Sequence, residues 1–142
     1  MELKDTTKKE DELLIAVKKG VTGTTEIVDE MGNRLMECAR LLRVEQSEMV
    51  FTALSEEIDN ISQLVEFIKE LKGGLGHLKG INIPPETFSC WDNSVGLFKE
   101  MLSAFEGKDW ITLADLIEYE LNPLFLEGKK GLSELNERLM AS

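Results

Sequence analysis

Carboxylates spaced three residues apart are the side chains of this sequence best placed to do chemistry. Residues three apart share one face of a helix, and two such pairs on facing helices can hold Mg²⁺ through oxygen ligands. Four residues form this pattern on two separate predicted helices: Glu26, Asp29, Glu56 and Asp59. They define a hypothetical metal site for a phosphohydrolase.

Those two pairs alone resemble the metal site of helical nucleotide pyrophosphohydrolases of the MazG kind. The resemblance implies a Mg²⁺-dependent, all-α pyrophosphohydrolase with the four carboxylates as metal ligands. Two observations count against it. Acidic residues make up 27 of the 142 positions, so such pairs arise by chance on solvated helix faces. In addition, no conspicuous set of lysines or arginines lies beside the pairs to neutralise a triphosphate.

The other reactive side chains do not predict a catalytic centre. His77 is the single histidine and lies in the glycine-rich segment 73–80, where we expect an exposed loop. One histidine excludes a histidine-rich zinc site and the Glu-x-x-His pairs of di-iron bundles. Cys38 and Cys90 are expected to be reduced, packed thiols rather than nucleophiles, and a disulfide between them is left open. The first interpretation therefore has no catalytic residue, no cofactor and no metal.

Composition and charge limit the partners. The chain has 142 residues, of which 42% are apolar, and a formal charge of −11. This length predicts a single domain over residues 1–142, with a flexible N-terminus over residues 1–9. The charge repels phosphate backbones and anionic lipid, no stretch of about 20 uncharged apolar residues occurs, and no signal peptide is visible. We expect a cytoplasmic protein that binds neither nucleic acid nor membrane.

The spacing of apolar residues predicts an all-α fold. Leu, Met, Glu, Lys and Ala dominate the chain, and apolar residues recur at alternating steps of three and four. Four amphipathic segments with short connections form a four-helix bundle. The helices are expected at roughly 10–43, 47–72, 85–106 and 109–140. Their expected apolar stripes are, in chain order, Leu14, Val17, Val21, Thr24, Val28, Met31, Leu35, Cys38 and Leu42; Val50/Phe51, Leu54, Ile58, Ile61, Val65 and Ile68, widened by Leu64 and Leu71; Phe88, Trp91, Val95, Phe98, Leu102 and Phe105; and Trp110, Leu113/Ala114, Ile117, Leu121, Leu124, Gly128, Gly131/Leu132, Leu135 and Leu139.

A few residues mark expected helix ends and breaks. The first helix is most open to a kink or break near Gly32, although its apolar stripe keeps its phase there. Ser47 is a candidate N-cap for the second helix and Gly73 its C′ residue. Asp109 can cap the fourth helix. Residues 73–84 form the one long connection, which either turns back tightly or crosses the bundle.

The last predicted helix has the most distinctive sequence. Pro123 predicts a bend near residues 119–123, and Gly128 and Gly131 lie on the apolar stripe, so another helix can approach closely there. The apolar face is also wider than one stripe, and the rest of the bundle, a second copy or a partner can cover the excess. The candidate interaction surface consists of Asp115, Glu118, Tyr119 and Phe125.

One segment of this helix resembles a segment of small, uncharacterised, acidic, all-helical bacterial proteins. The resemblance rests on Asp109-Trp110, on Leu113-Ala114-Asp115-Leu116, and on Glu118-Tyr119-Glu120-Leu121 followed by Pro123. It covers about 20 residues and implies a soluble, helical bacterial protein with no attached activity. The size, acidity and helical content are also similar to those of small export chaperones such as those for flagellin, at the level of fold alone.

Two hypotheses about function follow. In the first, the chain is a non-enzymatic helical bundle, adaptor-like, chaperone-like or self-associating, that binds another protein or forms a homodimer. An acidic surface suits a basic or helical partner, and an amphipathic helix can enter a groove between helices. The alternative is the Mg²⁺-dependent pyrophosphohydrolase.

Overall fold

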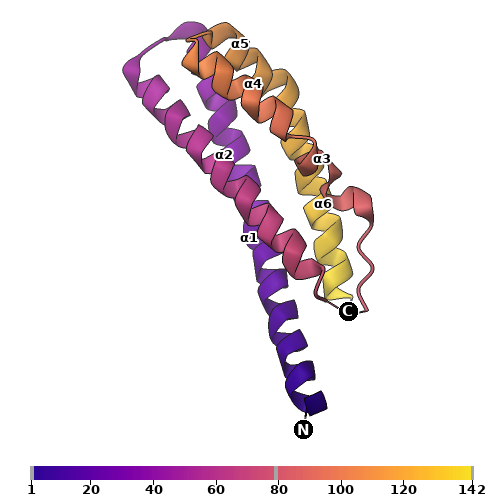
Figure 1. Cartoon of the computed structure of the whole chain (residues 1–142). Coiled ribbons are helices and arrows are strands. Elements are labelled where there is room, and N and C mark those ends of the chain that lie inside the picture. Colours follow the sequence, from indigo (N-terminus) through magenta and orange to yellow (C-terminus); the bar gives the residue numbers. More distant parts are fainter. Residues whose placement is uncertain (1, 79, 142) are drawn as a thin grey trace.

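The computed structural model describes residues 2–78 and 80–141, and it confirms the all-α four-helix bundle. Within these ranges no strand occurs, and no helix is apolar over enough residues to cross a membrane. The N-terminal turns of α1 extend beyond the other rods (Figure 1). The first two rods are α1 (Glu2–Val44) and α2 (Glu48–Leu75); the third joins the 3₁₀-helix η1 (Pro85–Phe88), α3 (Ser89–Asp92) and α4 (Val95–Glu106); the fourth joins α5 (Trp110–Asp115), the π-helix η2 (Leu116–Leu121) and α6 (Asn122–Met140).

The first rod, α1, is one uninterrupted helix that stays helical through Gly32. Every member of its predicted stripe from Val17 to Leu42 is buried. That burial outweighs the roughly 0.5–1 kcal/mol that each helical glycine costs. The helix begins at Glu2, so residues 2–9 are helical where the sequence predicted a flexible N-terminus; residue 1 lies outside the described residues.

The second rod, α2, begins where the sequence predicts and ends later. The Ser47 hydroxyl accepts a hydrogen bond from the Val50 backbone N–H at 3.5 Å, which confirms the N-cap. Gly73 is not the C′ residue, because the helix continues to Leu75. Leu75 is buried, and burying a leucine side chain contributes about 1.5–3 kcal/mol. This gain offsets the cost of the glycines that precede it in the helix.

The third rod is not the single helix that the sequence predicts over residues 85–106. A turn separates α3 from α4. The buried Ser94 donates its hydroxyl to the Trp91 carbonyl at 2.5 Å, and its backbone N–H donates to the same oxygen at 3.2 Å. Bonds to a carbonyl three residues back tighten the chain locally. Beyond the turn, Met101 faces the core, whereas Leu102 of the predicted stripe does not.

The fourth rod contains a wide turn, η2, just before Pro123, where the sequence predicted a bend. In a regular α-helix the proline ring would clash with the carbonyl of Tyr119. In η2 the Asn122 N–H instead donates to the Ile117 carbonyl, five residues back. A π-turn accommodates one extra residue. Just after it, Phe125 is buried in place of the predicted Leu124, whereas Gly128, Leu132, Leu135 and Leu139 are buried at their predicted positions.

The central rod is α1, which packs on α2, α5 and α6. Ion pairs accompany this packing: for example, Arg34 Nε lies 2.7 Å from Glu57 Oε1 on α2, and Asp29 Oδ1 lies 2.7 Å from Lys129 Nζ on α6. The exposed Asp29–Lys129 pair contributes at most about 1 kcal/mol, and the Arg34–Glu57 pair must offset the desolvation of a buried carboxylate. Burial of the apolar stripes therefore holds the rods together.

The close approach predicted at Gly128 and Gly131 is confirmed. A Cβ atom at Gly128 would lie 2.7 Å from Cε2 of Trp91, and one at Gly131 would lie 3.1 Å from the carbonyl oxygen of Thr87. The neighbours are α3 and η1, which rest directly on the backbone of α6.

The connection after α2 stays at one end of the bundle (Figure 1). Residues 80–84 run beside the last turns of α6, and Arg138 donates a hydrogen bond to the Asn82 carbonyl oxygen at 3.3 Å. The segment therefore leads the chain from the end of α2 onto α6.

Candidate functional site

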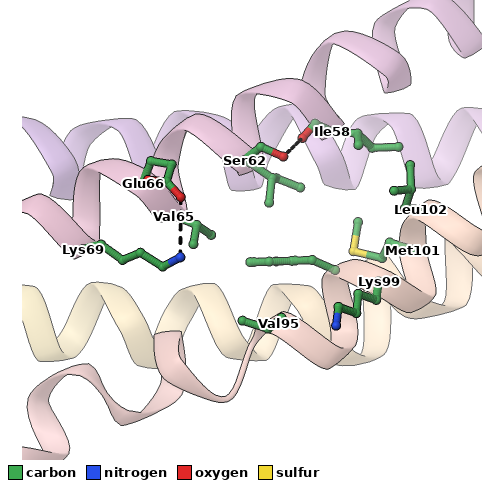
Figure 2. A pocket seen from close by; sticks show the side chains of 11 residues that line it. Ile58, Ser62, Val65, Glu66, Lys69, Val95, Lys99, Met101 and Leu102 are labelled. Carbon is green, nitrogen blue, oxygen red and sulfur yellow. Dashed lines mark hydrogen bonds and ion pairs between the residues drawn. The ribbon is translucent and has the colours of Figure 1, made fainter.

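An open apolar groove lies between α2 and α4. α2 packs mainly on α1, and α4 packs on α5 and η2, so the seam between α2 and α4 is not closed by helix packing. The groove has a volume of about 290 Å³, and side chains of both helices face one another across it (Figure 2). This α2/α4 groove is lined by Ile58, Ile61, Ser62, Val65, Glu66 and Lys69 of α2 and by Val95, Phe98, Lys99, Met101 and Leu102 of α4.

The groove has a buried floor and an exposed apolar rim. Ile61 and Met101 are almost fully buried and form the floor. On the rim, Val95 is 42% exposed and Leu102 is 43% exposed. Two large apolar side chains of α4 therefore border the open channel and remain in contact with water.

Polar groups of the groove are largely engaged with each other. The Ser62 hydroxyl donates to the Ile58 carbonyl oxygen at 3.4 Å, and Lys69 Nζ lies 3.5 Å from Glu66 Oε1, as the dashed lines in Figure 2 mark. Beside its mainly apolar lining, the groove thus offers the charged groups of Glu66, Lys69 and Lys99. Lys99 on the α4 side has no ion pair within the described part of the chain.

The outer side of α2 adds an acidic edge to the groove. Glu66 lines both the groove and a neighbouring shallow hollow that also contains Glu70 and the 41% exposed Phe67. Asp59 lies seven residues before Glu66, on the same side of the helix. We call Asp59, Glu66 and Glu70 the acidic edge.

The four carboxylates of the hypothetical metal site do not come together. Asp29 is bound to Lys129 of α6, and Glu56 and Asp59 are exposed on α2. Glu26 lies in a different hollow, between α1 and α6. Within residues 2–78 and 80–141, no three His, Cys, Asp or Glu side chains are grouped so that they could hold a metal ion. The geometry that the pyrophosphohydrolase hypothesis requires is therefore not present there.

Of the four residues predicted to form an interaction surface on the fourth rod, some are engaged with α1 or buried. Arg43 at the end of α1 donates Nη2 to Asp115 Oδ1 and to Glu118 Oε2, both at 2.7 Å. These two carboxylates therefore tie the fourth rod to α1. Tyr119 is 67% exposed, as expected, but Phe125 is 3% exposed, so its placement on the interaction surface is wrong. The error lies just beyond η2, where Phe125 takes the core position that the periodicity assigned to Leu124.

The two cysteines and His77 show no features of a catalytic site within the part of the chain that the structure describes. Both cysteines are free thiols, and His77 is exposed in the turn after α2, as the sequence predicts. Burial raises the pKa of the Cys38 thiol, and the charge of Glu57 raises it further. Burial, with a smaller effect of Glu127, raises the pKa of the Cys90 thiol to about 11. Thiols with raised pKa values are poor nucleophiles at neutral pH.

We expect Cys90 to alkylate about tenfold more slowly in the folded chain than in urea at pH 8. Raising the pKa from 9.0 to about 11 lowers the thiolate fraction about a hundredfold, and the more basic thiolate recovers about tenfold in nucleophilicity. Peptide mass spectrometry after iodoacetamide treatment measures each cysteine separately. The folded state keeps the thiol protonated, so the stability that it contributes is present below pH 9 and is lost as the pH rises towards 11. Equal alkylation rates in the two states would contradict the assignment.

Glu57 is a buried carboxylate that periodicity did not single out. It lies on the buried face of α2, three residues after Leu54 and four before Ile61, and is 7% exposed. Arg34 Nε donates to its Oε1 at 2.7 Å, while Oε2 has no hydrogen-bond partner among the described residues. The signal was present in the spacing, because an acid at a stripe position must find a partner.

The groove residues were predicted, but as core. Ile58, Val65, Val95 and Leu102 all belong to predicted stripes, yet each lines the groove. The available signal was the width of the apolar face of α2, where Leu64 and Leu71 widen the stripe. A face that wide buries one side against α1 and leaves the other for the groove.

The fold and the groove define an all-α four-helix bundle with an open apolar seam. The chain belongs to the family described as "Domain of unknown function (DUF8042)", whose model matches residues 21–131. That range contains both helices of the groove. No curated protein and no solved structure matches the chain.

Proposed function

We propose that this protein is a non-enzymatic helical bundle that binds another protein through the α2/α4 groove. The single observation that carries the proposal is the apolar rim of the groove, where Val95 and Leu102 are each more than two-fifths exposed next to a buried floor. Apolar side chains of a partner can fill a channel of this kind and remove its rim from water.

The size and chemistry of the groove favour a protein partner over a small molecule. A volume of about 290 Å³ lies at the lower limit for small-molecule sites, yet it can hold a few anchor side chains. The polar groups of Ser62, Glu66 and Lys69 already bond within α2. Apolar anchoring on a helix pair is the mode by which grooves bind amphipathic helices.

The proposal also includes a cytoplasmic location and a bacterial origin. The free thiols Cys38 and Cys90 are typical of a reducing compartment, which supports a location in the cytoplasm. The resemblance of residues 109–123 to a segment of small acidic helical proteins supports a bacterial origin.

The test selects helical peptides that bind the whole chain and then measures their affinity for variants of the chain. We expect Leu102→Asp to weaken the selected peptides at least tenfold, because a charge placed on the apolar rim must lose its hydration when the peptide binds. Leu126→Asp is the matched control, since Leu126 is 60% exposed outside the groove, and it should leave the affinity unchanged. Fluorescence anisotropy measures both.

Two outcomes would overturn the proposal. One is a selection that yields no binding peptide. The other is a set of peptides whose affinity is the same for the unchanged chain and for Leu102→Asp, with circular dichroism showing that the variant keeps its helices.

A further inference from the structure

The acidic edge beside the groove identifies the chemistry of the segment that binds there. This inference rests on the proposed function. Asp59, Glu66 and Glu70 follow the α2 wall at helical spacing, and all three are exposed. Only Lys69 offsets them locally, through an exposed ion pair with Glu66 at 3.5 Å, and such a pair is weak.

The opposite wall carries a different charge. Lys99 on α4 lines the groove without an ion pair among the described residues. The lining itself therefore contains Glu66 and Lys69 on the α2 side and Lys99 on the α4 side. The other two carboxylates of the acidic edge, Asp59 and Glu70, lie outside this lining, on the outer side of α2. A segment lying between the walls meets both of them, one along each of its edges.

The dimensions of the groove set the length of this segment. Its lining on α2 runs from Ile58 to Lys69, which is about 16 Å at 1.5 Å per residue. This corresponds to about three turns of helix. The anchors of such a segment recur every three or four residues.

We infer that the groove binds a basic amphipathic helix of about three turns. Its apolar face contacts Val65, Phe98 and Leu102, a lysine- or arginine-rich edge lies along the acidic edge of α2, and an acidic residue on the other edge meets Lys99.

Charge complementarity also argues against a second copy of this chain as the occupant. Each copy carries a formal charge of −11, so two copies repel each other at low ionic strength. A basic helix is attracted by the same field. The attraction between exposed charges weakens with salt, because the Debye length falls from about 30 Å at 0.01 M to about 8 Å at 0.15 M ionic strength.

The experiment uses two synthetic peptides with the same apolar face, one with lysines and one with glutamates along the edge that lies against α2. We expect the lysine peptide to bind the whole chain about tenfold more tightly at low salt, with a smaller advantage at high salt. The double variant Glu66→Gln/Glu70→Gln should remove most of this advantage. Glu30→Gln/Glu134→Gln changes the net charge equally at exposed positions outside the groove, and it should preserve the advantage.

The other outcomes separate the inference from the proposed function. If both peptides bind equally and Leu102→Asp abolishes both, the basic partner is wrong and the groove remains the binding site. If neither peptide binds, the groove proposal fails and the inference fails with it. If sedimentation shows a dimer of the chain that Leu102→Asp dissociates, a second copy occupies the groove and the inference is overturned.

Discussion

Gly128→Ala is expected to destabilise the folded chain by roughly 2 kcal/mol, although alanine is the better helix former. The new Cβ would lie 2.7 Å from Cε2 of Trp91, a ring that is 3% exposed and packed against Phe125 with centroids 5.8 Å apart. Overpacking a buried site typically costs about 1–3 kcal/mol. We expect the clash to exceed the gain of about 0.5–1 kcal/mol from replacing a helical glycine. Urea unfolding followed by circular dichroism measures the difference.

Gly23→Ala provides the matched control. Gly23 also lies inside a helix, but a Cβ there would meet nothing within 4 Å. This substitution is expected to stabilise the chain by about 0.5–1 kcal/mol. Two substitutions with the same chemistry therefore have opposite signs. If Gly128→Ala were as stable as Gly23→Ala, α3 could not lie directly on the backbone of α6.

Removing one residue from the π-turn is expected to leave the bundle folded. Glu120 is exposed in η2, and its deletion turns the wide turn into a regular one while preserving the phase of α5 and α6. Pro123→Ala accompanies the deletion, because proline inside a regular helix costs about 3 kcal/mol. We expect the melting temperature of this variant to stay within a few degrees of that of the unchanged chain, as measured by calorimetry.

Deleting one residue from α6, beyond the π-turn, should in contrast strongly destabilise the bundle. Ser133 is exposed in the regular part of α6, and its deletion rotates the following residues by about 100°. Leu135 and Leu139 then leave the core, at an expected cost of about 3–6 kcal/mol. Deletion of Ser133 with Pro123→Ala is thus the control for deletion of Glu120 with Pro123→Ala. Equal melting temperatures would show that η2 does not absorb an extra residue.

The helices and their buried faces were predictable wherever one helix contacts the core along most of its length. α1 is the clearest case, since each stripe residue from Val17 to Leu42 is buried. Caps were equally predictable, because Ser47 and Asp109 accept hydrogen bonds from amides three residues on. Both features depend on neighbours within a few residues, which the sequence displays directly.

Changes of helical phase were not predictable from spacing alone. The assignment of Phe125 to a surface assumed 3.6 residues per turn throughout, but just after η2 Phe125 is buried in place of Leu124. The turn at Ser94 has the same effect on α4, where Leu102 leaves the core. Local hydrogen bonds mark both places, from Asn122 N–H to the Ile117 carbonyl and from Ser94 to the Trp91 carbonyl, and apolar periodicity does not contain that information.

The candidate site was visible in its residues but not in its geometry. Periodicity identified Ile58, Val65 and Val95 as apolar face residues, and it could not tell a face covered by a neighbour from one that borders a gap. That distinction depends on how far α2 and α4 stand apart, which packing of each helix on its own neighbours determines. The carboxylate pairs failed for the same reason, because spacing along a helix does not say which helices face each other.

Methyl NMR of the whole chain, titrated with the lysine-edged peptide, tests the central claim most directly. The account predicts that the methyl shifts that change first and most belong to Ile58, Val65, Val95 and Leu102. Exposed apolar side chains elsewhere, at Ile15, Ile111 and Leu126, should keep their shifts. Changes concentrated at those three residues, with the groove methyls unaffected, would contradict the account.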